Sequence, residues 1–298
     1  MSPTVQAAPY IFSCTDQITF RPKQRVVGTI IEWHLGDNLI HLHFLRSLAA
    51  ANPDVQFLHA AQEEYLWQLA EMVADVPNIK LISLAAALQI PDFTWLHAWK
   101  NADSYFVKHP GWWAFCEFHL DWFAHLSQRM GFRSPFSRNE DLIFDYPALL
   151  RASDRFPSLG DFDFLFINSC PRSGQLSAYN SLEYLDPLLT EIINAGHSVV
   201  VTQPTSVQKL AGDKGKGRIL CTQDYGMSVT DIGRVSRHCR HHIMVSTGPS
   251  WPVLNKWNLP SGNLRVLFLE HERLNYPSVI HVPNRERCRE LLVERKLL

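Results

Sequence analysis

The sequence lacks an excess of either charge, a long apolar run and a secretory start. Its 298 residues include 28 Lys and Arg against 29 Asp and Glu, a formal net charge of −1. This balance gives no electrostatic reason to bind nucleic acid, so we expect no nucleic-acid partner. Apolar runs such as residues 26–33 are far shorter than the roughly 20 residues that span a bilayer. No basic start precedes an apolar core and a small-residue cleavage site, so we expect a cytoplasmic protein without a signal peptide.

Paired cysteines are also missing. The six cysteines are widely scattered and none forms a C-x-x-C pair. This spacing does not resemble a disulfide framework, so we expect free thiols in a reducing compartment. His238, His241 and His242 lie close together, but no acidic or cysteine partner has the spacing of a metal ligand. We interpret them as a solvated helix end and expect no metal.

The common nucleotide and hydrolase signatures are absent as well. There is no G-x-x-x-x-G-K-[ST] and no G-x-G-x-x-G, which excludes a Walker loop and the dinucleotide-binding fingerprint. Neither G-x-S-x-G nor a Cys/His signature supports a hydrolase. No D-x-D pair stands in a loop, so a metal-dependent glycosyl transfer is not indicated. We therefore expect no cofactor.

What the sequence does contain is an alternation of strands and helices. Residues 26–31 form a continuous apolar run, which is typical of a strand buried on both faces. Apolar positions from Leu39 to Ala49 then recur at three- and four-residue steps, which predicts a helix that stops at Asn52-Pro53-Asp54. A strand at 55–58, a helix at 63–74 and a strand at 80–82 follow. This pattern predicts a parallel sheet with helices on its faces. Residues 1–24 look like an arm or an edge hairpin.

The alternation restarts after a loop at 151–161. A helix at 115–130 precedes that loop, and the aromatic residues between Trp95 and Trp122 are expected in a buried core. We expect later strands at 162–168, 198–202, 219–222, 243–246 and 266–269, and helices at 182–195, 229–238, 251–257 and 284–298. The expected fold is therefore α/β, with two Rossmann-like doubly wound domains at 1–155 and 156–298 facing each other across a cleft. Ligands bind at the carboxyl ends of such sheets.

The turn Gly36-Asp37-Asn38 between the first strand and the first helix is the first candidate site. Glycine permits a tight turn, and the N–H groups of a helix start attract anionic oxygens. The helix dipole would favour the ionised form of Asp37, and such a carboxylate can accept a proton from an attacking sugar hydroxyl. His34 and His41 flank the turn and could line the cleft. An Asp at a helix start is more often only a cap, and that alternative stays open.

Two further loops follow strands of the second half. Ser246, Thr247, Gly248, Pro249 and Ser250 form a small, hydroxyl-rich turn that could cradle a diphosphate. Arg172, in the loop after the strand at 162–168, could pair with a phosphate through its planar guanidinium group. An ordinary turn and a surface arginine are the respective alternatives.

Together these segments resemble the ADP-heptose:lipopolysaccharide heptosyltransferase family, whose members adopt the GT-B architecture of two Rossmann domains. Residues 29–48 are similar to the opening strand, the Leu-Gly-Asp turn and the helix after it. Residues 52–55 resemble the close of that helix, and residues 227–232 and 243–250 resemble the nucleotide side. The resemblance implies a metal-independent, inverting glycosyltransferase.

The resemblance also implies roles for single residues. Asp37 falls on the general base, Thr247 and Gly248 fall on the loop that holds the donor diphosphate, and Met227 falls near the donor base. Arg172 falls near a basic phosphate contact. We expect transfer from a nucleotide-diphosphate sugar, bound by the C-terminal domain, to a glycan or lipid-linked acceptor on the N-terminal domain.

Ser246 stands where the family usually has Asp, and Trp251 where it often has His. These departures leave open a non-catalytic nucleotide-sugar-binding or assembly protein, and a hydrolysing epimerase on the same fold. Residues 284–298 form a basic tail, and contact of this tail with a membrane that carries a lipid-linked acceptor is a further open point.

Overall fold

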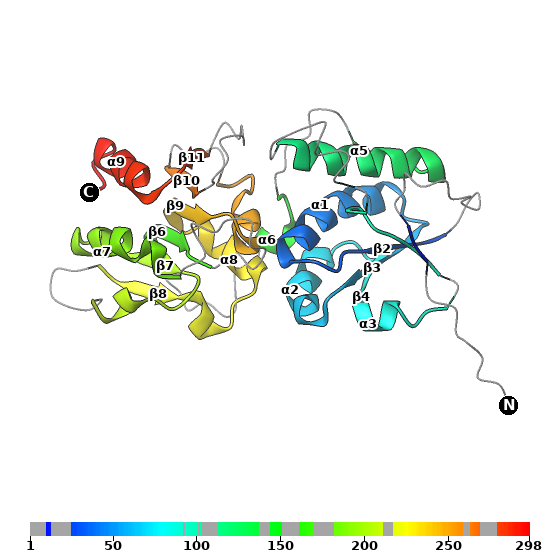
Figure 1. Ribbon diagram of the computed structural model, residues 1–298, viewed down its shortest axis with the longest axis horizontal. Coiled ribbons are helices and arrows are strands. Elements are labelled where there is room, and N and C mark those ends of the chain that lie inside the picture. The colour runs from blue at the N-terminus through cyan, green and yellow to red at the C-terminus, as the bar shows by residue number, and fades with distance from the viewer. Residues whose placement is uncertain are drawn as a thin grey trace. The chain divides into compact units, whose positions relative to one another are not determined.

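The chain forms two compact units, Met1–Leu142 and Ile143–Leu298. A computed structural model (Figure 1) describes residues 10–12, 25–91, 93–100, 102, 113–136, 144–150, 161–169, 182–210, 217–258, 263–268 and 279–298. The sequence placed the division later, between residues 155 and 156. Each unit is described by itself below.

The first unit contains a parallel sheet of five described strands. Their order across the sheet is β1 (Tyr10–Phe12), β5 (Thr94–Leu96), β2 (Val26–Ile30), β3 (Gln56–Ala61) and β4 (Ile79–Ser83). Each neighbouring pair runs parallel. The three predicted strands are confirmed. The hairpin alternative for the first residues is wrong, because β1 pairs with β5 in parallel and a hairpin is antiparallel.

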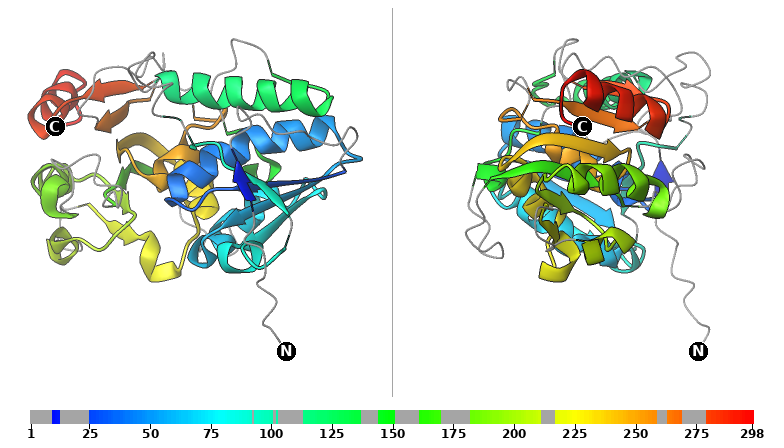
Figure 2. Two further views of the ribbon diagram at one scale, coloured as in Figure 1. Left: turned by 45° about the vertical axis from the view of Figure 1, so that its right-hand side comes forward. Right: turned by 90° about the vertical axis from the view of Figure 1, so that its left-hand side faces the viewer.

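Four described helices accompany this sheet. They are α1 (Leu35–Ala51), α2 (Glu63–Val73), α3 (Leu84–Ala87) and α5 (Trp113–Met130). The helices predicted in this half are confirmed, and α1 begins directly after the segment that leaves β2. α5 packs along α1, and the two helices lie side by side in Figures 1 and 2. In the described segments of both units, no helix is both long enough and apolar enough to cross a bilayer.

A glycine in β2 allows the aromatic core of the first unit to close. Gly28 lies opposite Trp95 in the register of β2 and β5. A Cβ at position 28 would lie 2.3 Å from the Phe93 ring and 2.8 Å from the Trp95 ring, which is too close for any side chain. Trp95 is completely buried, and Trp99 and Trp122 are buried too. The predicted aromatic core is confirmed.

The second unit contains a parallel sheet of six described strands. Their order across the sheet is β11 (Ile280–Val282), β10 (Arg265–Phe268), β9 (Cys239–Val245), β6 (Phe162–Ile167), β7 (Val199–Val201) and β8 (Ile219–Cys221). β6 comes first in the chain and lies in the centre, with β7 on one side and β9 on the other. This is the doubly wound 3-2-1-4-5-6 order of nucleotide-binding folds. The predicted second α/β half is confirmed.

The helices of the second unit include both α and 3₁₀ turns. The α-helices are α6 (Pro147–Leu150), α7 (Asp186–Asn194), α8 (Val229–Ser236) and α9 (Arg285–Glu294), and the 3₁₀ turns are η2 (Leu182–Leu185), η3 (Ser206–Leu210), η4 (Thr222–Tyr225) and η5 (Gly248–Val253). The prediction of an α-helix at 251–257 is wrong, because η5 takes its place. Pro249 and Pro252 lie within this turn and have no N–H for α-helical hydrogen bonds.

Helix α8 packs so closely that only glycine fits at position 233. A Cβ there would lie 2.6 Å from the Leu149 side chain and 2.8 Å from Pro252. Arg234 Nε donates to the Ala148 carbonyl at 2.7 Å, and Arg237 also donates to α6, at 3.0 Å from the Leu149 carbonyl. Residues 147–150 therefore belong to the second unit, which explains why the division comes earlier in the chain than the sequence indicated.

Two of the three histidines of the predicted solvated helix end belong to a strand, because His241 and His242 lie in β9. His238 is exposed just after α8, as the interpretation required. His242 is a buried residue of β9, and its Nε2 donates to the Ser236 carbonyl at 2.9 Å. The interpretation is wrong for His241 and His242 because β9 begins at Cys239, four residues earlier than the predicted strand.

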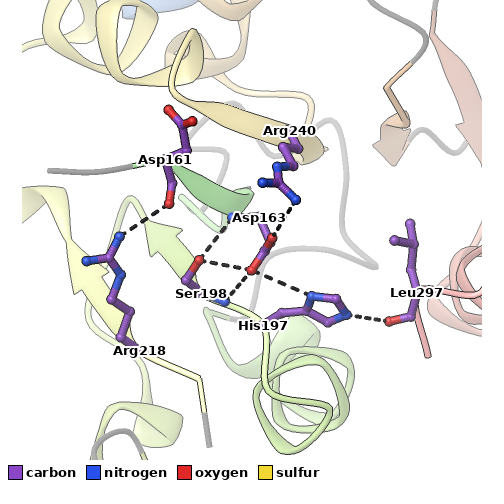
Figure 3. A network of polar contacts seen from close by, with 7 residues as sticks. All are labelled: Asp161, Asp163, His197, Ser198, Arg218, Arg240 and Leu297. Atoms are coloured by element: carbon purple, nitrogen blue, oxygen red, sulfur yellow. Dashed lines mark hydrogen bonds and ion pairs between the residues drawn. The ribbon is translucent and has the colours of Figure 1, made fainter.

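A polar cluster joins the amino ends of β6 and β7 (Figure 3). Asp163 Oδ2 accepts hydrogen bonds from the Ser198 N–H at 2.9 Å and the Ser198 hydroxyl at 3.0 Å. His197 Nδ1 lies 3.6 Å from the same carboxylate, Arg240 lies 3.7 Å from it, and His197 Nε2 donates to the Leu297 carbonyl at 2.9 Å. Burial raises the pKa of Asp163, but the Ser198 hydrogen bonds with His197 and Arg240 outweigh it and lower the pKa below its ordinary value.

We predict that Asp163→Ala lowers the free energy of unfolding at pH 7 by about 1–3 kcal/mol. A carboxyl with a lowered pKa in the folded chain stabilises it above the ordinary pKa and loses this effect as the pH falls through the folded value. The difference from wild type should therefore shrink towards pH 3 in urea titrations. Asp161→Ala is the control, because the Asp161 backbone carbonyl, rather than its carboxylate, accepts from Arg218. Equal losses in the two variants at pH 7 would contradict the role of the Asp163 carboxylate.

Candidate functional site

The strand order of each sheet marks where a ligand can bind. In the first unit, the chain moves from β2 to β3 and β4 on one side and to β5 on the other. In the second unit, β6 and β9 are the corresponding neighbours. Loops that leave two such strands diverge and open a crevice at the carboxyl ends, which is where ligands bind in this class of sheet. The candidate segments therefore follow β2 and β5 in one unit, and β6 and β9 in the other (Figure 1).

Asp37 lies in the turn that follows β2. The His34 N–H donates to Asp37 Oδ2 at 3.2 Å, and Asn38 Nδ2 donates to the His34 carbonyl at 2.9 Å. Burial raises the pKa of Asp37 to about 6, against the opposing effect of the His34 hydrogen bond. The expectation that the helix start favours the ionised carboxylate is therefore wrong in direction. At pH 7 the carboxylate is still mainly ionised, and it binds a proton far more readily than an ordinary Asp.

Asn38 anchors this turn to the sheet. Its Oδ1 accepts from His59 Nε2 at 2.9 Å, and the Thr29 hydroxyl donates to His59 Nδ1 at 3.0 Å. All three side chains are completely buried, and burial lowers the pKa of His59 to about 3, so the ring is neutral. The expectation that Asn38 lines a cleft needs correction, because its amide is used to fix the turn to β2 and β3.

His41 is also away from any surface. It is 0% exposed and stacks on His59 with ring centroids 5.2 Å apart, and it packs against Trp122 and Phe123 of α5. Burial lowers its pKa well below the ordinary value. The expectation that His41 lines the cleft is corrected accordingly, because the α1 face that carries it packs against α5. His34 and Gly36 remain partly exposed at the turn.

Aromatic residues that the sequence reasoning missed lie beside the Asp37 turn. Trp33 is 43% exposed and stacks on Trp99, with ring centroids 5.6 Å apart and 29° between the planes. His97 meets the Trp33 ring edge-on at 5.8 Å. Trp33 follows β2, whereas His97 and Trp99 follow β5, so the contacts span the two strands of the switch point. The signal in the sequence was a tryptophan placed directly after an apolar strand.

The loop after β9 contains a hydroxyl that has no partner among the described residues. Thr247 is extended, with φ −140° and ψ 169°, and precedes η5. Its Oγ1 is buried and, within the described residues, has no hydrogen-bond partner. The Ser250 hydroxyl donates to the Val245 carbonyl at 2.6 Å, which shapes the loop. Ser246 is nearly buried, and Gly248 and Pro249 are partly exposed. Because η5 is a short 3₁₀ turn, the loop offers fewer aligned N–H groups than the expected α-helix start.

Polar residues that the sequence analysis did not single out join the ends of β6 and β7. Asn168 Oδ1 accepts from the N–H groups of Thr202 at 3.1 Å and Gln203 at 2.9 Å. The hydroxyls of Ser169 and Thr202 lie 2.9 Å apart. This network ties the carboxyl end of β6 to the end of β7. β6 also pairs with β9 on its other side.

The remaining predicted residues are placed as follows. Met227 is nearly buried between η4 and α8, where the left-handed Gly226 (φ 58°) ends η4. Ser228 then accepts from the Asp231 N–H at 3.1 Å and caps α8. Arg172 lies outside the described residues. In the described part of the chain, no three His, Cys, Asp or Glu side chains gather as a metal ion would require.

No protein-family model matches the chain, and no curated protein matches it. Solved structures do match. E. coli heptosyltransferase WaaC with ADP aligns over 91% of this chain and 98% of its own, with 13% sequence identity and a TM-score of 0.54. WaaC with ADP-2-deoxy-2-fluoro heptose aligns over 91% and 99%, with 13% identity and a TM-score of 0.57. The iron-containing dodecameric glycosyltransferase TibC of enterotoxigenic E. coli aligns over 88% and 63%, with 12% identity and a TM-score of 0.50.

At this level of identity, the likeness concerns the fold. The chain has the fold of these heptosyltransferases. Each of its two units is of Rossmann type, with helices packed on a sheet of parallel strands. The expected GT-B-like fold class is confirmed, and so is the structural side of the resemblance read from the sequence.

We predict that Asp37→Asn stabilises the chain at pH 8 by up to about 2 kcal/mol. The folded carboxyl has a pKa of about 6 against an ordinary 3.8. As the pH rises, the unfolded chain loses this proton first, so wild-type stability falls between about pH 4 and pH 6. The variant has no charge to bury, so its advantage should be present at pH 8 and absent at pH 4 in urea titrations.

Asp231→Asn is the matched comparison, because Asp231 holds the same capping position in α8. Its carboxylate accepts from Ser228 and from Arg234, at 2.8 Å. We expect this variant to be less stable than wild type at pH 8, since it leaves Arg234 without its carboxylate. An Asp37→Asn variant that is also less stable at pH 8 would contradict the raised pKa of Asp37.

Proposed function

We propose that the chain is an inverting, metal-independent glycosyltransferase that uses a nucleotide-diphosphate sugar. The observation that carries the proposal is a half-buried carboxylate at the switch point of a Rossmann-type sheet, with a pKa of about 6. A general base works best when its pKa lies near the working pH, because it must be ionised and must still attract a proton. Asp37 meets both requirements.

The reaction needs one proton acceptor and one site for a leaving group. The acceptor hydroxyl gives its proton to Asp37 while its oxygen attacks the anomeric carbon from the side opposite the diphosphate. The bond between that carbon and the diphosphate oxygen breaks, and the electron pair leaves with the nucleoside diphosphate. In this scheme, the first unit binds the glycan or lipid-linked acceptor and the second unit binds the donor.

The donor side rests on the loop after β9. The Thr247 hydroxyl and the N–H groups around Gly248 would bind the diphosphate and stabilise its growing charge, a role that often supplies the largest catalytic term. Ser246, Pro249 and Ser250 shape that loop, Met227 would pack near the donor base, and Arg172 would pair with a phosphate. The WaaC structures with ADP and ADP-2-deoxy-2-fluoro heptose support a nucleotide-diphosphate donor.

The first functional prediction concerns turnover. Asp37→Asn should lower it by about 10²–10⁴-fold, with donor affinity little changed. Wild-type turnover should rise with pH through about 6, as Asp37 loses its proton. A thermal-shift screen of nucleotide sugars selects the donor, and release of nucleoside diphosphate with a panel of acceptors measures the rate.

The same assay distinguishes the transferase from the two alternative functions, a non-catalytic nucleotide-sugar binder and a hydrolysing epimerase. Binding without product across the panel would indicate a non-catalytic binder, and nucleotide release that needs no acceptor would indicate a hydrolysing epimerase. Equal turnover in wild type and Asp37→Asn would remove Asp37 from the mechanism.

A second prediction concerns Thr247. Thr247→Val keeps the shape of the side chain and removes a buried hydroxyl that lacks a partner among the described residues. We expect the free chain to gain about 1 kcal/mol of stability, and nucleoside-diphosphate affinity to fall by roughly 10-fold. Calorimetric titration and urea unfolding measure the two effects. Thr247→Ser is the control, because it keeps the hydroxyl and should keep the affinity. Unchanged affinity in Thr247→Val would exclude a contact between this hydroxyl and the donor.

A further inference from the structure

Trp33 is an exposed aromatic residue at the place where the first sheet opens. The residue is 43% exposed, and it stands between the end of β2 and the first turn of α1, which carries Asp37. The Asp37 carboxylate accepts from the N–H of His34, the residue next to Trp33, at 3.2 Å. Trp33 and the proposed base therefore belong to one short turn.

The Trp33 ring rests on a rigid support. It stacks on Trp99, which is buried and stacks in turn on Phe118 of α5, with ring centroids 5.3 Å apart and 28° between the planes. Because Trp99 covers one face of the Trp33 indole, the exposed area belongs to the rest of the ring. Such a supported ring loses little conformational entropy when a ligand packs on it.

The Glu32 carboxylate lies beside this platform, close to the His97 ring. The backbone N–H of Trp99 donates to His97 Nδ1 at 3.1 Å. Burial lowers the pKa of His97, so the ring is neutral and its proton is on Nε2. That Nε2 is buried, has no hydrogen-bond partner in the described residues and lies 3.9 Å from Glu32 Oε1. Glu32 itself is exposed, and Gln62 Nε2 holds its backbone carbonyl at 2.6 Å.

We propose that Trp33 and Glu32 form an acceptor subsite for an uncharged pyranoside ring. The apolar face of the sugar would pack on the indole, because its C–H bonds are weakly positive and the ring face is negative. Sugar hydroxyls would donate to the Glu32 carboxylate, with His97 and Trp99 as positioning residues. The subsite rests on the proposed function and places a sugar hydroxyl near Asp37.

Charge selects against acidic sugars at this subsite. Glu32 and Asp37 place two carboxylates in one turn, and both repel a uronic acid or a sugar phosphate. Lys100 is a nearby positive charge that acts on His97. One positive charge balances one of these two carboxylates. The residues around Trp33 therefore favour a neutral, hydroxyl-rich ring.

The test is saturation-transfer NMR on the full chain at pH 8, without donor. The probes are methyl β-glucoside, methyl β-galactoside and methyl β-glucuronide. We expect at least one neutral glycoside to bind and the glucuronide to bind more weakly. Trp33→Ala should weaken the neutral glycoside by roughly 3- to 10-fold, and Trp33→Phe should retain most of the binding. Trp67→Ala is the matched control, since Trp67 of α2 is 49% exposed and should have no effect.

Three outcomes would overturn the subsite: no binding of either neutral glycoside, equal binding by wild type and Trp33→Ala, or preferred binding of the glucuronide. Because the measurement uses neither donor nor turnover, it is independent of the proposed function. Glycoside binding at Trp33 without any transfer would refute the transferase and leave Trp33 and Glu32 as a sugar-binding site only. Transfer that depends on Asp37 but not on Trp33 would support the transferase and refute the subsite.

Discussion

Parallel strand pairing is the constraint on which the rest of the structure depends. Every described strand pair in both sheets runs parallel, so the segments that follow the strands all leave from one edge of their sheet. The order of the strands then decides where two neighbouring segments diverge, at β2 with β5 and at β6 with β9. Asp37 and Trp33 belong to the first of these places, and Thr247 belongs to the second. Chemistry at these positions therefore follows from the winding of the chain, and the side chains only specify which chemistry it is.

Three polar groups at the edges of the sheets differ in their surroundings. At the amino edge of the second sheet, the Asp163 carboxylate has partners from Ser198, His197 and Arg240, and its pKa is lowered. At the carboxyl edges, burial raises the pKa of Asp37, and the Thr247 hydroxyl has no hydrogen-bond partner in the described residues. A buried polar group without a partner destabilises the fold, so its presence needs an explanation. The proposed donor, bound at the loop after β9, would give the Thr247 hydroxyl a partner.

The sequence predicted the long, periodic elements and the fold class, because apolar runs and three- and four-residue spacings reflect burial directly. It missed the three-residue strands β1, β5 and β11, although it found β7 and β8, which are equally short. It also placed an α-helix where two prolines produce the turn η5. At the candidate site, the turn around Asp37 was found from its position. The burial of Asn38 and His41 was not, because it depends on α5 and β3, which are distant in sequence. The raised pKa of Asp37 has the same tertiary origin.

The stacked indoles of Trp33 and Trp99 have an optical consequence. Transitions of two aromatic rings whose centroids lie 5.6 Å apart couple electronically, and a pair of indoles held in one fixed chiral arrangement gives circular dichroism bands of opposite sign that neither ring gives alone. One ring follows β2 and the other follows β5, so this couplet reports the separation of the two strand ends. The first unit thus contains a spectroscopic signal of this separation that needs no added label.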